Sequence, residues 1–221
     1  MKKTIPLTLA VLAAAVITFA AGPAFVPLFN GKDLTGFQPT PGPWKVSDGV
    51  LSLVGRTDEQ MQNKNYLWTS QMYGNFVLDL EFKVPERANS GVFIRTSDLK
   101  DPVQTGIEIQ VTSGHPDGSV DRGTVGSIYD LVVPKDNAYK AGQWNHYVIT
   151  CQGPNIKVEL NGQVVSEANL DRWNTAHRNP DGSENKFNRP LRSFARKGYI
   201  GFQDHGTPVS YRNIRIQVLD K

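Results

Sequence analysis

The sequence contains one cysteine, Cys151, among 221 residues. A single cysteine cannot form an internal disulfide, so an exported form of this chain must obtain its stability from packing. The net charge is only +3, and no basic run stands out beyond the two N-terminal lysines, which argues against a nucleic-acid partner. The four histidines show no metal-ligand spacing. We therefore assign no metal ligands and no cofactor, and leave a divalent metal as an open alternative.

Long apolar runs are also missing, with one exception at the N-terminus. MKKTIPLTLAVLAAAVITFA has two lysines, an apolar run and then small residues, which is the pattern of a secretory signal peptide. A retained membrane anchor is the alternative reading of a run this long. We predict a signal peptide at residues 1–20, export to the periplasm or the extracellular space, and no stable membrane insertion after cleavage. Residues 25–221 are then long enough for one domain with its own core.

Short alternating runs fill the remaining chain, separated by frequent glycine and proline. Hairpin signals lie between some of them, including DG at 48–49 and NG at 161–162. Many short strands joined by tight turns indicate an all-β sandwich or barrel. The predicted strands are 44–47, 50–54, 76–84, 91–96, 106–111, 144–151, 155–160, 163–166, 198–203 and 210–219.

One polar segment, residues 168–197, interrupts this pattern. It holds a helix-like stretch around 170–177 and an NPDG turn at 179–182. A long excursion from a compact β domain is often a lid or a rim loop. The pattern supports equally a surface insertion without a role.

Four of the predicted strands, 76–84, 91–96, 106–111 and 198–203, share one design, with apolar residues on one face and polar or aromatic residues on the other. If these strands are neighbours, their polar faces form a lining suited to a sugar, whose hydroxyls need paired donors and acceptors and whose ring stacks on aromatic side chains. The alternative is a solvated outer face with cross-strand charge pairs. The residues in question are Arg95, Glu108, Gln110, Gln203 and His205, with Tyr199 and Phe93 as aromatic platforms.

The paired-carboxylate arrangement of retaining glucanases is absent from the strand that contains Glu108. That arrangement spaces its acids E-x-D-x-x-E, whereas this chain has Gln110 and then Ser113 at the following positions. Ordinary double displacement is therefore disfavoured at this strand.

Several motifs together resemble the 3-keto-disaccharide hydrolase family, exported bacterial proteins with a concanavalin A-like jelly-roll domain. The most specific are NGKDLTGF at 30–37 and QDHG at 203–206, and the similarity continues through YGNFVLDLEFKV, NSGVFIRT, GIEIQV, GSIYDL, GQWNHYVITCQG and GYIGFQDHG. The resemblance implies a two-sheet jelly-roll sandwich that binds a carbohydrate substrate. It also implies cleavage of glycosides whose sugar carries a ketone at carbon 3.

Such a ketone makes the hydrogen on carbon 2 acidic, so a single base can start an elimination that expels the glycosidic oxygen, after which water adds. We predict Glu108 or His205 as the base and Arg95 as the group that stabilises the enolate or anchors Glu108. The predicted substrate-binding residues are Gln110, Gln203, Tyr129, Asp204 and Tyr199. A non-catalytic carbohydrate-binding module is the main alternative, and a structural or partner-binding sandwich is the third.

Overall fold

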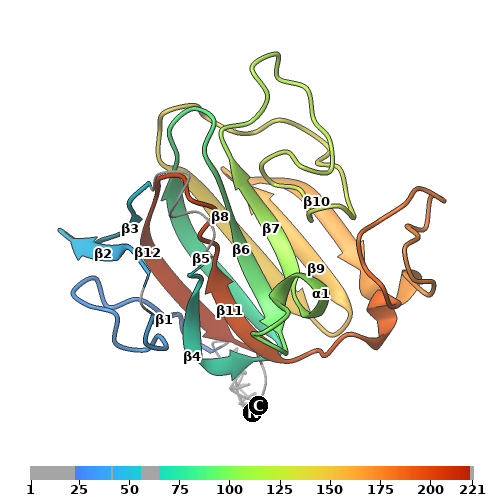
Figure 1. Cartoon of the computed structure of the whole chain (residues 1–221), viewed down its shortest axis with the longest axis horizontal. Helices are drawn as coiled ribbons and strands as arrows, with labels where there is room; N and C mark the ends of the chain where they lie inside the picture. Colours follow the sequence, from blue (N-terminus) through green and yellow to red (C-terminus); the bar gives the residue numbers. More distant parts are fainter. Residues whose placement is uncertain (1–22, 41, 56–64, 220–221) are drawn as a thin grey trace, which may run out of the picture.

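Two antiparallel sheets packed face to face form the protein, which confirms the predicted all-β jelly-roll sandwich (Figure 1). The computed structural model describes residues 23–40, 42–55 and 65–219. The larger sheet has the order β10 (Gln163–Asn169), β9 (Asn155–Leu160), β8 (Asn145–Gln152), β5 (Phe76–Lys83), β12 (Val209–Val218), β3 (Val50–Leu53) and β2 (Trp44–Ser47), and β1 (Val26–Pro27) also pairs with β12. The smaller sheet has the order β4 (Leu67–Tyr73), β11 (Gly198–Phe202), β6 (Asn89–Thr96) and β7 (Ile107–Thr112).

The core lies between the two sheets and follows from the alternation along each strand. On β5, the residues Phe76, Leu78, Leu80 and Phe82 are all fully buried. The aromatic pair Phe82–Tyr147 packs with ring centroids 4.6 Å apart. The Tyr147 hydroxyl also crosses the core and donates to the Gln110 carbonyl oxygen at 2.6 Å, which ties the larger sheet to β7.

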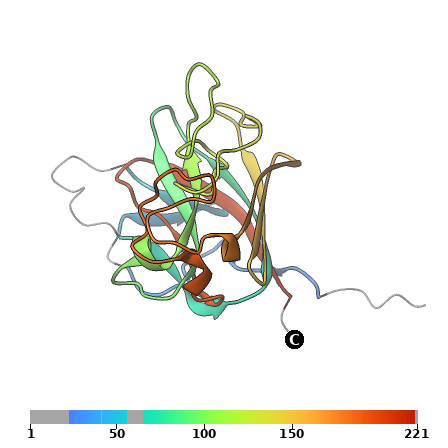
Figure 2. The same cartoon turned by 90° about the vertical axis from the view of Figure 1, so that its right-hand side faces the viewer.

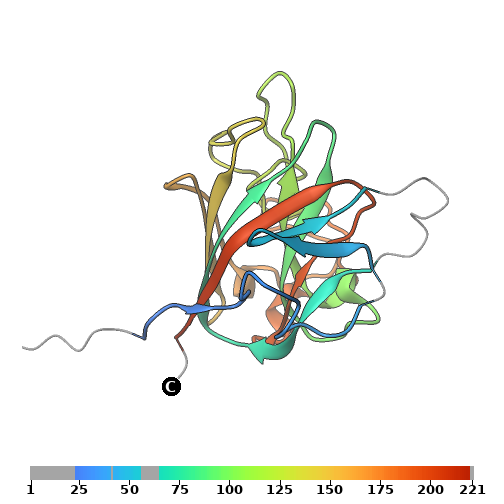
Figure 3. The ribbon, with the colours of Figure 1, turned by 90° about the vertical axis from the view of Figure 1, so that its left-hand side faces the viewer.

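Both predicted two-residue hairpins are present. Asp48 and Gly49 have φ angles of 52° and 77°, and Asn161 and Gly162 have φ angles of 53° and 82°. Two successive positive φ values define a type I′ turn, whose twist matches that of the flanking strands. Figure 3 shows the first of these hairpins, β2–β3, beside the long strand β12.

Each edge strand of the smaller sheet is covered by a segment of irregular chain. Along β4, the amide of Gln38 donates to Trp68 O, and the amide of Ser70 donates to Gly36 O. Along β7, segment 126–129 does the same: Gly126 N donates to Gln110 O and Tyr129 N to Glu108 O. The backbone groups at these two edges are thus already paired within the chain.

The structure differs from the sequence-based expectations at four elements. Strand β4 was not predicted, because its middle is polar (Thr69, Ser70, Gln71) and hides the alternation, and the two-residue strand β1 was also missed. The helix expected around 170–177 is only a 3₁₀ turn, Leu170–Arg172, and a short helix not predicted, α1 (Pro102–Thr105), precedes β7.

The predicted signal peptide lies outside the described residues. Within the described ranges, no helix has the length and apolarity needed to cross a bilayer.

Cys151 is fully buried on β8, and burial raises the pKa of its thiol to about 12. At pH 8 about one thiol in ten thousand is then ionised, and the thiolate is the reactive form. We expect the native protein to resist a disulfide reagent such as Ellman's reagent and to react with one equivalent after unfolding in urea. Stoichiometric labelling of the native protein within minutes would contradict this.

Candidate functional site

A second, separate group of aromatic residues covers the outer face of the smaller sheet. Tyr66, Trp68 and Phe93 are each at most 9% exposed, with ring centroids 5.3–6.0 Å apart, and Leu99 and Tyr199 pack against them. These side chains face away from the main core, so an aromatic surface lies on the side of the sheet that a ligand can approach. Tyr199 is therefore where the sequence predicted an aromatic platform.

Two glycines within the strands allow large side chains to lie flat on this sheet. A Cβ added to Gly201 would come within 2.1 Å of the Trp68 ring, and one added to Gly91 within 2.4 Å of Glu108 Oε1. Any larger residue at either position would collide with these groups. Gly91 therefore leaves the space that the Glu108 carboxylate occupies, and Gly201 leaves the space for the Trp68 indole.

Glu108 is the acidic group of this face, and it is 6% exposed. Its Oε2 lies 3.6 Å from the ammonium nitrogen of Lys186, which also sits 4.3 Å above the centre of the Tyr129 ring. Burial lowers the pKa of Lys186, and the charges of Glu108 and Asp130 act in the opposite direction. A carboxylate and an ammonium are thus held together in a largely dry setting, where electrostatic effects are strong.

Gln203 and Tyr66 form the other side of the site. Gln203 Nε2 donates to the Tyr66 hydroxyl oxygen at 3.3 Å, while the buried Gln203 Oε1 accepts no hydrogen bond from any described residue. Burial raises the pKa of Tyr66 to about 12, which the Gln203 hydrogen bond offsets only in part. Tyr66 therefore keeps its proton at neutral pH, and its hydroxyl can act as a donor in this site.

The structure gives Asp204 a positioning role in place of the predicted direct contact with substrate. The side chain is fully buried, and its two oxygens accept hydrogen bonds from the amides of Asn65 (3.2 Å) and Gly206 (3.0 Å). These bonds fix the chain on both sides of the QDHG motif. Asp204 thereby helps to hold Gln203 and His205 at the end of β11.

Arg95 does not join the group around Glu108, contrary to the expectation from strand alternation. It has a positive φ of 53°, which breaks the alternation on β6. Its guanidinium is buried at the turns of both sheets, where it donates to Gly74 O (2.8 Å), Gly153 O (2.6 Å) and Asn75 Oδ1 (3.1 Å). We correct its role from catalytic to structural.

Replacing Arg95 by methionine should therefore lower the free energy of unfolding by about 3 kcal/mol, because it leaves buried carbonyl oxygens without donors. Urea unfolding measures this change, and the exposed Arg178→Met is the matched control, for which we expect less than about 0.5 kcal/mol. A stable Arg95→Met variant with lost activity would restore the catalytic assignment.

The other predicted residues lie on or beside the same sheet. Gln110 is 3% exposed and its Oε1 accepts from the amide of Val111 (3.2 Å). Tyr129 is half-buried beneath Lys186. His205, also half-buried, follows Gln203 by two residues, and Gln203 N donates to Gly91 O, so His205 lies beyond the end of β11 on the flank of β6. Its role as a base stays a prediction.

Segment 168–197 forms a fixed wall beside this face, on the right of Figure 1 and facing the viewer in Figure 2. Four of its large residues, Trp173, Phe187, Leu191 and Phe194, belong to the main core. The Asn179 side chain accepts a hydrogen bond from the Trp173 indole within the segment (2.7 Å) and donates to the Asp130 carbonyl outside it. Lys186 belongs to this wall. The side-chain amide of Gln104, on α1, donates to the backbone oxygen of Lys186 (2.9 Å).

A hollow of about 340 Å³ lies beside the aromatic group and is large enough for a small sugar. Tyr66 and Trp68 line one side, and residues 99–103 line the other. A larger hollow, about 510 Å³, lies on the opposite side of the sandwich and contains none of these residues. Among the residues that the structure places, no three His, Cys, Asp or Glu side chains gather closely enough to hold a metal ion.

Sequence reasoning missed three residues of this site: Tyr66, Trp68 and Lys186. The first two belong to or precede the unpredicted β4. Lys186 lies in a polar segment without periodicity, so no pattern in the sequence indicated it.

Comparison with known proteins bears on the family and the fold. A family model described as a 3-keto-alpha-glucoside-1,2-lyase-like domain matches residues 24–217. A 3-keto-disaccharide hydrolase from Bacteroides thetaiotaomicron is 28% identical over 89% of this chain and 79% of its own length. A crystal structure of a protein assigned as a glycosyl hydrolase from Parabacteroides distasonis is 35% identical, covers 89% of this chain and all of its own, and superposes with a TM-score of 0.79. A carbohydrate-binding module from Bacillus subtilis, with 14% identity and a TM-score of 0.51, shares the fold alone.

Proposed function

This chain belongs to the 3-keto-alpha-glucoside-1,2-lyase-like domain family, and we propose that it cleaves glycosides whose sugar is oxidised to a ketone at carbon 3. The observation that carries the proposal is the buried Glu108–Lys186 pair on the sheet face that also carries the aromatic group, where Glu108 is the cross-strand partner of Phe93. An enolate-forming reaction needs a base that accepts the proton and a positive charge that stabilises the oxygen. The carboxylate of Glu108 and the ammonium of Lys186 are groups of these two kinds.

The first step is removal of the proton on carbon 2. We assign this step to Glu108, with His205 as the alternative base. The electron pair of the C–H bond moves toward carbon 3, and the ketone oxygen becomes an enolate oxygen with a negative charge. The ammonium of Lys186 takes the role that the sequence gave to Arg95, because a positive charge in a dry site stabilises this oxygen as its charge develops.

The second step breaks the bond between carbon 1 and the glycosidic oxygen. The enolate re-forms the ketone, a double bond appears between carbons 1 and 2, and the leaving oxygen takes up a proton. Tyr66 is the donor we assign, because its raised pKa keeps the hydroxyl protonated. Water then adds its hydroxyl to carbon 1 and a proton to carbon 2, so that the sum is hydrolysis.

Two measurements test this reaction. The purified protein should release sugar from a 3-keto disaccharide and none from the unoxidised parent, because only the ketone acidifies carbon 2. In D₂O, the released 3-keto sugar should carry deuterium at carbon 2. The control is the free 3-keto sugar incubated with the enzyme for the same time, which measures exchange of that hydrogen after release. Cleavage of the unoxidised parent at a similar rate would overturn the proposal. Binding of the 3-keto disaccharide without cleavage would favour a carbohydrate-binding module.

A further inference from the structure

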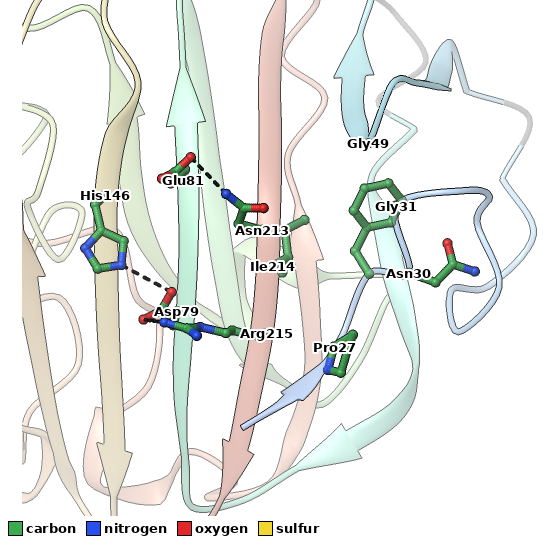
Figure 4. Close-up of a pocket in the computed structure, with 11 residues that line it drawn as sticks. Pro27, Asn30, Gly31, Gly49, Asp79, Glu81, His146, Asn213, Ile214 and Arg215 are labelled. Atoms are coloured by element: carbon green, nitrogen blue, oxygen red, sulfur yellow. Dashed lines mark hydrogen bonds and ion pairs between the residues drawn. The ribbon is translucent and has the colours of Figure 1, made fainter. Parts of the chain in front are cut away.

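The hollow on the outer face of the larger sheet is separate from the site described above. It measures about 510 Å³. Strands β8, β5 and β12 form its floor, with His146, Asp79 and Arg215 side by side on the three strands (Figure 4). Residues 27–31 and Gly49 form its side wall. The smaller sheet and the main core lie between this hollow and Glu108.

The charged groups of this hollow are paired with one another. Asp79, 8% exposed, holds His146 Nε2 at 3.2 Å from Oδ1 and Arg215 Nη2 at 3.2 Å from Oδ2. Glu81 likewise accepts hydrogen bonds from Arg212 Nε and from Asn213 Nδ2. Two carboxylates thus face two guanidinium groups. A charged ligand would displace one of these partners, whereas a neutral ligand would not.

Hydrogen-bonding capacity remains on the floor of the hollow, next to apolar residues. The side chains of Arg215 and His146 are 54% and 42% exposed. Arg215 presents further donors to a ligand although it also binds Asp79, and His146 binds Asp79 through Nε2, which leaves its Nδ1 for a ligand. Pro27 is the exposed apolar residue of the same hollow, and Phe29 and Ile214, which are 5% and 1% exposed, also line it. At Gly49 an added Cβ would meet no atom within 4 Å, so this part of the wall is open backbone.

We propose that this hollow is a second binding site, for a neutral sugar of one or two rings. A sugar combines hydroxyls that need both donors and acceptors with an apolar ring face, and it carries no charge. These properties match a lining that has polar and apolar groups and whose charges are already paired with one another. The site would hold an unoxidised sugar while the smaller sheet carries out cleavage, so it does not depend on the proposed reaction.

Backbone amide NMR of the full domain tests this inference, since each site contains two glycines. Gly31 and Gly49 report on the second site, and Gly91 and Gly201 on the first. Titration with maltose at millimolar concentrations should shift the signals of Gly31 and Gly49, and glucuronate at the same concentrations should not. Shifts confined to Gly91 and Gly201, or no shifts at all, would overturn the proposal.

Two variants then locate the contact. Arg215→Ala removes a largely exposed donor. The affinity for maltose, measured from the shifts of Gly31 and Gly49, should fall at least tenfold in this variant. Arg192→Ala, an exposed arginine on segment 168–197, is the matched control and should leave that affinity unchanged. Equal affinity in Arg215→Ala and the wild type would also overturn the proposal. Glu108→Gln should leave these shifts intact, which separates this site from the first.

Discussion

Glu108→Gln should lower kcat for a 3-keto disaccharide by about 10³-fold. The amide has nearly the same shape as the carboxylate but cannot accept the proton from carbon 2, and a positioned general base contributes about 10²–10⁴-fold to a rate. Because glutamine fits the same space against Gly91, the smaller sheet and the aromatic group should keep their structure in the variant. Steady-state kinetics with the 3-keto substrate measures the effect.

The control for this variant is Glu167→Gln, which makes the same chemical change on β10 of the larger sheet. The Glu167 side chain is 52% exposed and is paired with Lys135. Glu167→Gln should retain wild-type kcat. His205→Ala, measured in parallel, decides between the two bases: a much larger loss in His205→Ala than in Glu108→Gln would move the base assignment to the histidine. Wild-type turnover in both variants would remove both residues from the mechanism.

Lys186→Met should lower kcat by about 10²–10³-fold and change KM much less. The ammonium is assigned to an oxygen whose negative charge exists fully only after proton removal, so its loss affects the transition state more than substrate binding. Lys135→Met, on a side chain that is 61% exposed, is the matched control and should behave as the wild type. An increase in KM with unchanged kcat would indicate that Lys186 only binds substrate.

The pH dependence of the same variants supplies a second readout. Burial lowers the pKa of Lys186, so its positive charge is lost at a lower pH than that of an ordinary lysine. In the wild type, kcat should fall as the pH rises through this lowered pKa. Lys186→Arg keeps its charge over that range, so the alkaline fall should move to higher pH or disappear. An identical alkaline limb in the two proteins would contradict the assignment.

Most of the sandwich followed from the sequence because alternation, tight turns and burial all point to the same strands. The type I′ turn at Asn161–Gly162 needs two residues that tolerate positive φ, and the sequence supplies them. Strand β4 escaped prediction because it is stabilised by its neighbours: Thr69 is fully buried although it is polar, and its hydroxyl binds Gln71 O and Ile200 N. Tertiary contacts of this kind leave no periodic signal.

The site was predictable in part for the same reason. Glu108 and Gln203 lie on strands whose faces could be assigned, and the structure places them on one face. The predicted position of Arg95 was wrong because its positive φ on β6 redirects the side chain. Positive φ is uncommon for residues other than glycine, so the sequence does not indicate it. Lys186 comes from a segment held by side-chain hydrogen bonds, chiefly those of Asn179, and such bonds have no repeating spacing.

The covered edges of the smaller sheet limit how anything can reach Glu108. With β4 bordered by residues 36–38 and β7 by residues 126–129, a peptide cannot add itself as a further strand on either side. Recognition by main-chain pairing is therefore closed to this sheet. A ligand must therefore approach the outer face of the smaller sheet and be recognised by side chains. This mode of binding suits a small rigid ring better than an extended polypeptide.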